Sequence, residues 1–261
     1  VLTALPIELN AARMAFGINE ETPAAKTDIG QNHWRAQVQT NKGTLATCTI
    51  ATFGTAGNVD AAAITATLLM ECKPKLVVMI GIAAGMREKT ALGDVIIADR
   101  VVAYEGAALL DGGKTEARPE IYRPVFSVQQ DIANYLASAK SASARIDSAR
   151  AHQDLVFPET SDAGAVSKRL MPQVATIGSG EKLLRDPEKF RQLRDLHGKV
   201  EVAEMEAAGI FAACAQHSVP SLIVRGISDF GDTKKDNTFH DLASRAAAIV
   251  ASDLVVFGMG S

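Results

Sequence analysis

A continuous apolar run at Leu76–Ile80 constrains the fold more than any other feature of this chain. A strand with one solvent face would alternate polar and apolar residues, so an unbroken run is typical of a strand buried on both faces. A second such run, Ser221–Arg225, follows a turn marked by Pro220. Strands of this kind need helices on either side of their sheet. The two runs therefore predict an α/β fold.

Helix patterns alternate with strand patterns along most of the chain, which indicates a central mixed, largely parallel twisted sheet flanked by helices. Helices are expected at Pro6–Phe16, Val59–Glu71, Val128–Ala139, Pro187–Leu196, Met205–Ala215 and Leu242–Val256. Strands are expected at Val1–Leu5, Trp34–Gln39, Thr44–Phe53, Leu76–Ile80, Val95–Tyr104, Gln173–Ile177 and Ser221–Arg225. We expect one domain over residues 1–261. Because the sequence opens at Val1 inside an apolar run, we interpret it as a fragment of a longer chain.

Composition and charge exclude several classes of partner. The formal net charge of −3 offers no electrostatic attraction for nucleic acid or an anionic membrane. No run of about 18 apolar residues occurs, so no segment is expected to span a bilayer. The three cysteines lack metal-ligand spacing and indicate reduced core residues of a cytoplasmic protein. The five histidines show no metal-binding spacing either, so we expect neither a metal nor an organic cofactor.

Carboxylates mark the stretches that carry the predicted chemistry. Glu204 lies close to Glu206, and Asp229 lies close to Asp232. Asp229 is expected just past the carboxyl end of a strand, where open α/β sheets place their ligands. Glu8 falls at a predicted strand-to-helix junction. A structural explanation stays open for each acid. Glu8, Glu204 and Glu206 near a helix N-terminus would complement the helix dipole, and Asp229 would be an ordinary turn or cap residue.

Five motifs, taken in order, resemble the purine nucleoside phosphorylase/uridine phosphorylase superfamily, nearest to its 5′-methylthioadenosine/S-adenosylhomocysteine nucleosidase branch. They are Ala4-Leu-Pro-Ile-Glu8, Leu76–Gly85, Leu92-Gly-Asp-Val95, Glu204-Met-Glu-Ala207 and Val224-Arg-Gly-Ile-Ser-Asp229. Any one motif is weak evidence, but the five together cover nearly the whole chain. The resemblance implies hydrolysis of the N-glycosidic bond of an adenine nucleoside, without a cofactor.

The resemblance also implies a role for each matching residue. Asp229, held by Ser228, would carry or relay a proton to purine N7, and Glu8 would activate a water for attack on C1′. Glu206 would accept hydrogen bonds from the ribose hydroxyls, with Met205 beneath the sugar. Further substrate contacts are expected from Glu204, Arg225, Gly81, Ile82, Ala83, Leu183 and Leu184. Arg225 has a structural alternative as the charge partner of Glu204.

Two positions bear on the nucleophile and the substrate. Phosphorylases of this superfamily collect phosphate with a Gly-rich loop and arginines, whereas this chain places the carboxylate of Glu8 there, which favours water. Ile82 replaces the Ser or Thr of bacterial nucleosidases. This form is similar to nucleosidase domains of larger defence and NLR-type proteins, some of which act on adenine nucleotides, including ATP, so an AMP or ATP nucleosidase stays open as an alternative. If the substrate carries a 5′-phosphate, the candidates to bind it are Arg13, Arg87 and Lys89. The alternative is that these residues are ordinary surface charges.

Three further consequences of the resemblance concern the whole protein. A phosphate-dependent phosphorylase stays open as an alternative activity. A catalytically silent binding domain, suggested by Ile82, is the alternative from another class, and it would be favoured if Asp229 or Glu8 pointed away from a shared cleft. The resemblance also implies a homodimer in which a neighbouring subunit closes the 5′ side of the pocket.

Overall fold

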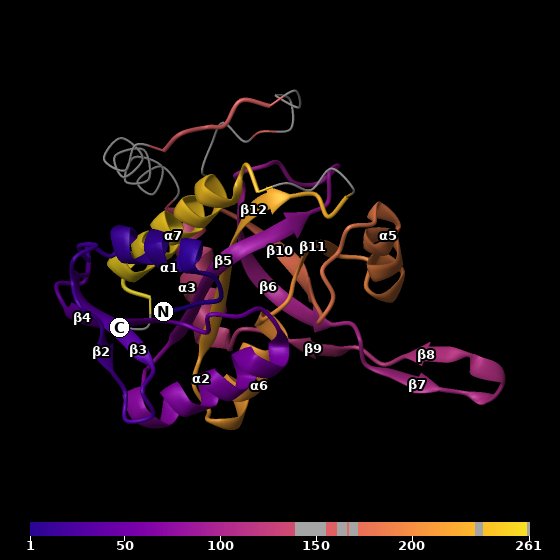
Figure 1. Ribbon diagram of the computed structural model, residues 1–261, viewed down its shortest axis with the longest axis horizontal. Helices are drawn as coiled ribbons and strands as arrows, with labels where there is room; N and C mark the ends of the chain where they lie inside the picture. The colour runs from indigo at the N-terminus through magenta and orange to yellow at the C-terminus, as the bar shows by residue number, and fades with distance from the viewer. Residues whose placement is uncertain (139–154, 161–165, 167–171, 233–236, 260–261) are drawn as a thin grey trace.

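The computed structural model describes residues 1–138, 155–160, 166, 172–232 and 237–259, and it is built around one large sheet (Figure 1). The strands of this sheet are β1 (Leu2–Thr3), β2 (Ala25–Lys26), β3 (Asn32–Gln39), β4 (Leu45–Thr52), β5 (Val77–Gly85), β6 (Val95–Ala103), β9 (Glu120–Tyr122), β10 (Pro172–Ser179), β11 (Val200–Glu204) and β12 (Ser221–Asp229). The helices are α1 (Pro6–Ala15), α2 (Asn58–Cys72), α3 (Phe126–Ala137), α5 (Pro187–Leu196), α6 (Ala207–Gln216) and α7 (His240–Phe257), with a 3-10 turn at Asp111–Gly113.

The sheet is mixed, as the sequence predicts. Its strands follow the order β11-β10-β6-β12-β5-β1-β4-β3-β2, with β9 paired to β6. β5 pairs in parallel with β1 and β12, and β10 pairs in parallel with β6 and β11. Antiparallel pairings join β12 to β6 and β11 to β5. These two pairings close β5, β12, β6, β10 and β11 into a ring.

Helices cover both faces of the sheet, which explains the unbroken apolar runs. On one face, α1, α3 and α7 share an apolar core that includes Ile80 and Val224. On the other face, α2 and α6 share a core that includes Met79 and Ile223. Successive residues of a strand point to opposite faces, so β5 and β12 feed both cores. Figure 1 shows α1 and α7 on one side of β5 and α2 and α6 on the other.

Near the predicted site, the strand boundaries differ from the sequence-based expectation. β12 continues to Asp229, so this residue ends the strand instead of following it. β11 is not predicted by the sequence pattern, because its five residues depend on pairings with the distant β10 and β5. As a result, Glu204 ends a strand, and α6 begins at Ala207 instead of Met205. Glu206 therefore lies at a buried junction between a strand and a helix.

One element projects from the body of the molecule. Strands β7 (Ala107–Leu109) and β8 (Thr115–Ala117) form a two-stranded hairpin that extends well beyond the sheet (Figure 1). Within the described ranges, none of the helices combines the length and the apolar character needed to cross a membrane.

Candidate active site

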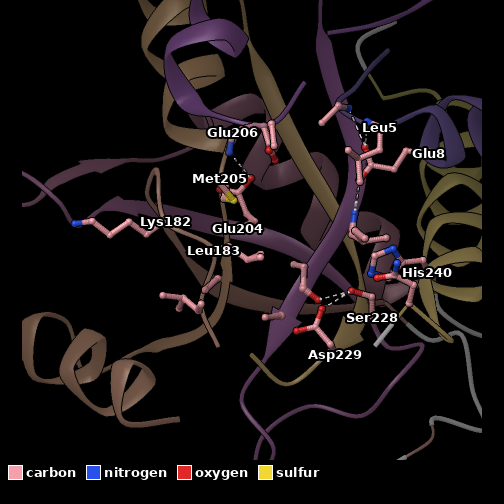
Figure 2. Close-up of a pocket in the computed structure, with 18 of the residues that line it drawn as sticks. Leu5, Glu8, Lys182, Leu183, Glu204, Met205, Glu206, Ser228, Asp229 and His240 are labelled. Carbon is pink, nitrogen blue, oxygen red and sulfur yellow. Dashed lines mark hydrogen bonds between the residues drawn. The ribbon is translucent and has the colours of Figure 1, made fainter. Parts of the chain in front are cut away.

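A cavity of about 400 Å³ lies toward the carboxyl ends of β5 and β12. Parallel strands place their ligand sites at this edge of a sheet. The lining includes most of the residues that the motifs single out: Glu8, Ile82, Ala83, Leu183, Leu184, Glu204, Met205, Glu206, Ser228 and Asp229. In Figure 2, Glu206 lies above the cavity, Glu8 to the right and Asp229 below, with Leu183 on the left. Segments that are far apart in the sequence therefore converge on one site.

Glu8 is held in the first turn of α1 by backbone donors. Its Oε2 accepts hydrogen bonds from the N–H groups of Ala4 (2.8 Å) and Leu5 (2.9 Å), and its Oε1 accepts one from Ile82 N–H (2.9 Å). Burial raises the pKa of Glu8, although the Arg225 cation and these N–H groups oppose the rise. A carboxylate with a raised pKa accepts a proton more readily, so Glu8 is suited to act as a general base.

Gly81 permits the close approach of Glu8 and Arg225 to strand β5. A Cβ at this position would lie 1.9 Å from Arg225 Nη1 and 2.8 Å from Glu8 Oε1. Any side chain would therefore displace the charged groups behind the cavity. Gly81 is not among the residues that line the cavity, and it shapes the site from behind the lining.

Arg225 forms a buried charged centre with two carboxylates. Its side chain is fully buried, and its Nη2 donates to Glu204 Oε2 and to Glu206 Oε2, the latter at 2.9 Å. A lone buried cation would be costly, and the paired carboxylates offset that cost. The structural alternative suggested by the sequence is therefore the observed one. Arg225 does not line the cavity, and it supports the acids that do.

The carboxylates of Glu204 and Glu206 differ in how many further hydrogen bonds they can accept. Glu204 accepts hydrogen bonds from the N–H groups of Glu206 (3.0 Å) and Ala207 (2.9 Å) as well as from Arg225. Glu206 accepts one hydrogen bond at Oε1, from Gly57 N–H (3.3 Å), and one at Oε2, from Arg225. Each carboxylate oxygen can accept two hydrogen bonds. Glu206 can therefore still accept two hydroxyl groups, such as those of a ribose.

The protonation of Glu206 is sensitive to its surroundings. Burial raises the pKa of Glu206 to about 7, Arg225 opposes this rise, and the nearby carboxylates of Glu204 and Glu8 add to it. The ionised form accepts hydrogen bonds more strongly than the neutral acid. The capacity of this residue to bind hydroxyl groups therefore changes near neutral pH.

Asp229 is fixed at the end of β12 by local hydrogen bonds. Its Oδ2 accepts one from Ser228 Oγ (3.0 Å), and its Oδ1 accepts one from Gly231 N–H (2.8 Å). The side chain is buried but lines the cavity opposite Glu206 (Figure 2). A carboxyl group held in this way can donate or relay a proton to a ring nitrogen of a base placed beside it.

The cations considered for a 5′-phosphate lie elsewhere. Arg13 stacks over the ring of Trp34 at 4.7 Å, and Arg87 pairs with Asp232 at 2.8 Å. Neither of these arginines lines the cavity, and Lys89 does not line it either.

Other polar residues also line the cavity. Lys182 adjoins Leu183 and Leu184 in the segment that the resemblance assigns to the purine, whereas Arg185, Asn237 and His240 lie outside the family motifs. Lys182 and Arg185 follow the end of β10. Because ligand sites lie beyond the carboxyl ends of strands, this position in the sequence was a signal that could have identified Arg185 as a lining residue. His240 begins α7, and its place in the cavity lining depends on how that helix packs. The sequence gives no local signal for this position.

Glu8, Glu206 and Asp229 line one cavity at the strand ends of a mixed α/β sheet, and Arg225 lies behind Glu206. The profile of the Phosphorylase superfamily matches residues 1–255, and the chain belongs to this family.

Relatives with established names share this family. The chain is 48% identical over 258 residues to the ATP nucleosidase Cap17 of Escherichia coli strain KTE188, covering 99% of this chain and 51% of that protein. It therefore spans about half the length of this relative. It is 26% identical over 194 residues to the 5′-methylthioadenosine/S-adenosylhomocysteine nucleosidase of Marinomonas sp. strain MWYL1, covering 73% of this chain and 72% of that protein.

A solved structure of the family has the same fold. It is the 5′-methylthioadenosine/S-adenosylhomocysteine nucleosidase of Neisseria meningitidis in complex with methylthio-immucillin-A. The TM-score is 0.69 at 21% identity, covering 98% of this chain and 96% of that one. This likeness confirms the predicted α/β architecture.

Proposed function

We propose that this chain hydrolyses the N-glycosidic bond of an adenine nucleotide or nucleoside and releases adenine. The observation that carries the proposal is the placement of Glu8, Glu206 and Asp229 on three sides of one cavity. Because Glu8 and Asp229 face the same space, the geometry argues against a catalytically silent binding domain.

The proposed reaction uses each carboxylate once. Asp229 donates or relays a proton to N7 of the leaving purine as the bond between C1′ and N9 breaks. Glu8 removes a proton from a water molecule whose oxygen attacks C1′, and the products are free adenine and the sugar with a hydroxyl at C1′. Glu206 accepts hydrogen bonds from the 2′- and 3′-hydroxyls and holds the sugar between the two. Acid and base on opposite sides of the bond are typical of inverting glycoside hydrolysis.

Charge favours water over phosphate as the nucleophile. A phosphate near C1′ would lie beside the carboxylates of Glu8 and Glu206, which would repel it. The buried guanidinium of Arg225 is already engaged by Glu204 and Glu206. Enzymes that bind phosphate use arginine forks with free donors. We therefore propose a hydrolase and expect no requirement for phosphate.

ATP is the substrate that we favour. The relative at 48% identity is named an ATP nucleosidase, whereas the methylthioadenosine/S-adenosylhomocysteine nucleosidases are 26–28% identical. The lining also contains Arg185 and His240, which suit an anionic 5′ group better than a thioether, whereas Lys182 pairs with Glu105 (3.4 Å). Thioether nucleosides are the second candidate, because Leu5 and Met205 give part of the same cavity an apolar wall.

A panel of substrates tests this proposal. Adenine release would be measured from ATP, AMP, adenosine, methylthioadenosine and S-adenosylhomocysteine, each with and without inorganic phosphate. We expect phosphate-independent release, with the highest kcat/KM for ATP. A preference for the thioether nucleosides would establish the second candidate, and a strict requirement for phosphate would contradict the role of Glu8.

We also propose that the protein forms a homodimer, as the family resemblance implies. Val59 and Met70 on α2 are 73% and 60% exposed, and such apolar side chains are suited to burial against a partner subunit. Light scattering coupled to size-exclusion chromatography would give the mass, and a monomer would contradict the proposal.

A further inference from the structure

We propose that Asn58, the first residue of α2, is a positioning residue that orients the carboxylate of Glu206 through the first turn of α6. The inference rests on the function proposed above, in which Glu206 binds the ribose hydroxyls. It concerns a residue outside the cavity lining and outside the family motifs.

The first turn of α6 is held by side chains from other elements. The N–H groups at the start of a helix have no partner within the helix. Glu206 is the residue before α6, and its side chain makes no capping hydrogen bond to that turn. The donors are satisfied from elsewhere: Ala207 N–H by Glu204 Oε2 (2.9 Å), Ala208 N–H by Ser179 Oγ (3.1 Å) and Gly209 N–H by Asn58 Oδ1 (2.8 Å). This arrangement leaves the carboxylate of Glu206 available to the cavity.

Asn58 joins three elements through one oxygen. Its Oδ1 accepts hydrogen bonds from Gly209 N–H (2.8 Å) on α6 and from Ser179 Oγ (3.0 Å) at the end of β10. The helices meet closely at this point, since a Cβ on Gly209 would lie 2.1 Å from the backbone oxygen of Asn58. The side chain of Asn58 therefore fixes the start of α2 against the start of α6.

The start of α2 in turn contacts the carboxylate itself. Gly57 N–H donates to Glu206 Oε1 (3.3 Å), and the next N–H, that of Asn58, donates to Glu181 Oε1 (3.1 Å). Loss of the Asn58 acceptor would leave the Ser179 hydroxyl and Gly209 N–H without this partner. Both the backbone before α6 and the Gly57 donor would then shift relative to Glu206. We infer that the orientation of Glu206 depends on Asn58.

Two substitutions at this position separate positioning from general stability. Asn58→Ala removes the acceptor, whereas Asn58→Asp keeps it. For each variant, kcat and KM would be measured with ATP, or with whichever adenine substrate the wild type cleaves, and with its 2′,3′-dideoxy counterpart. The dideoxy compound lacks the hydroxyls that Glu206 binds, so it reports on every other part of the site.

We expect a loss that depends on the ribose hydroxyls. Asn58→Ala should lower kcat/KM about tenfold for the ribose substrate, which is the effect of losing one hydrogen bond between Glu206 and a ribose hydroxyl. For the dideoxy substrate the loss should be less than about twofold. Asn58→Asp should restore activity to within about threefold of wild type, because a carboxylate accepts both hydrogen bonds. If Asn58→Ala does not fold, Ser179→Ala removes one of the same contacts and should give the same selective loss.

The controls distinguish the possible failures. Thr67→Ala changes an exposed side chain of the same helix, whose hydroxyl donates to Ala63 O, and should leave both substrates unaffected. Equal losses on the two substrates, or no loss, would overturn the inference while leaving the proposed function intact. A wild-type protein that releases adenine from none of the substrates would instead overturn the proposed function, and this inference with it.

Discussion

Glu8 and Asp229 face one cavity from different elements, and each is held by backbone N–H groups that leave it little freedom to move. Loss of a positioned acid or base lowers turnover by about 10²–10⁴-fold. We therefore expect Asp229→Asn and Glu8→Gln each to lower kcat by this amount. Asp229→Asn should do so with little change in the midpoint of thermal unfolding, whereas Glu8→Gln should also lower that midpoint, because its amide turns a donor toward a backbone N–H. Asp111→Asn, on the exposed turn of the projecting hairpin, is the matched control. Turnover close to wild type in Asp229→Asn would show that another group supplies the proton.

Glu206 gives the enzyme a pH dependence whose sign follows from its surroundings. Burial raises its pKa to about 7, and only the ionised form binds the ribose hydroxyls strongly. KM should therefore be constant at about pH 8 and above, and should rise up to about tenfold per pH unit as the pH falls below about 7. Glu206→Gln should give a high KM without this dependence. The same pH dependence in Glu206→Gln would assign the titration to another group.

At the scale of helices and strands, the sequence predicts the elements that have a local signal. The apolar runs at Leu76–Ile80 and Ser221–Arg225 identify β5 and β12, and Asp229, which follows the second run, lines the cavity. β11 and the place of His240 in the cavity lining are not predicted, because both depend on pairing or packing with distant segments. The same limit applies to Arg225. The sequence suggests that Glu204 is a possible charge partner, but only the structure shows that Arg225 lies behind Glu204 and Glu206 and outside the cavity lining.

The packing of β12 against α7 positions Asp229. A substitution that adds one methyl group at the contact between them tests this packing. A Cβ on Gly226 would lie 2.0 Å from the backbone oxygen of Ala243 in α7. We expect Gly226→Ala to destabilise the protein by about 1–3 kcal/mol, because a well-packed interior accommodates added volume only by backbone shifts. Thermal or denaturant unfolding would measure the loss. Gly198→Ala is the control, since its nearest neighbour, Arg194 O, would lie 4.0 Å from the new Cβ. Equal stability of the two variants would contradict the close packing.

At the scale of the whole molecule, the site draws on the entire length of the chain. Glu8 belongs to α1, Ile82 to β5 and Asp229 to β12, while Leu183 follows β10 and Glu206 follows β11. The ends of four of these strands, β5, β10, β11 and β12, meet because these strands and β6 form a closed ring of pairings. A ligand in the cavity therefore contacts segments that only the complete fold brings together.

This dependence predicts how substrate affects stability. A ligand that binds only the folded state adds about 2.7 kcal/mol at a free concentration of 100 times Kd. For a chain of this size, that should raise the midpoint of unfolding by about 5–11 °C, at roughly 2–4 °C per kcal/mol. The Asp229→Asn variant can be heated with intact ATP, provided that it does not turn over. We expect a single unfolding transition whose midpoint rises when ATP is added, because the ligand contacts segments from both ends of the chain.

The double variant Asp229→Asn with Glu206→Gln should show a smaller rise in the midpoint of unfolding on addition of ATP. Thermal unfolding in two resolved transitions, of which ATP raises the midpoint of only one, would contradict the expectation of a single transition. The cavity would then belong to a folding unit smaller than the ring of five strands.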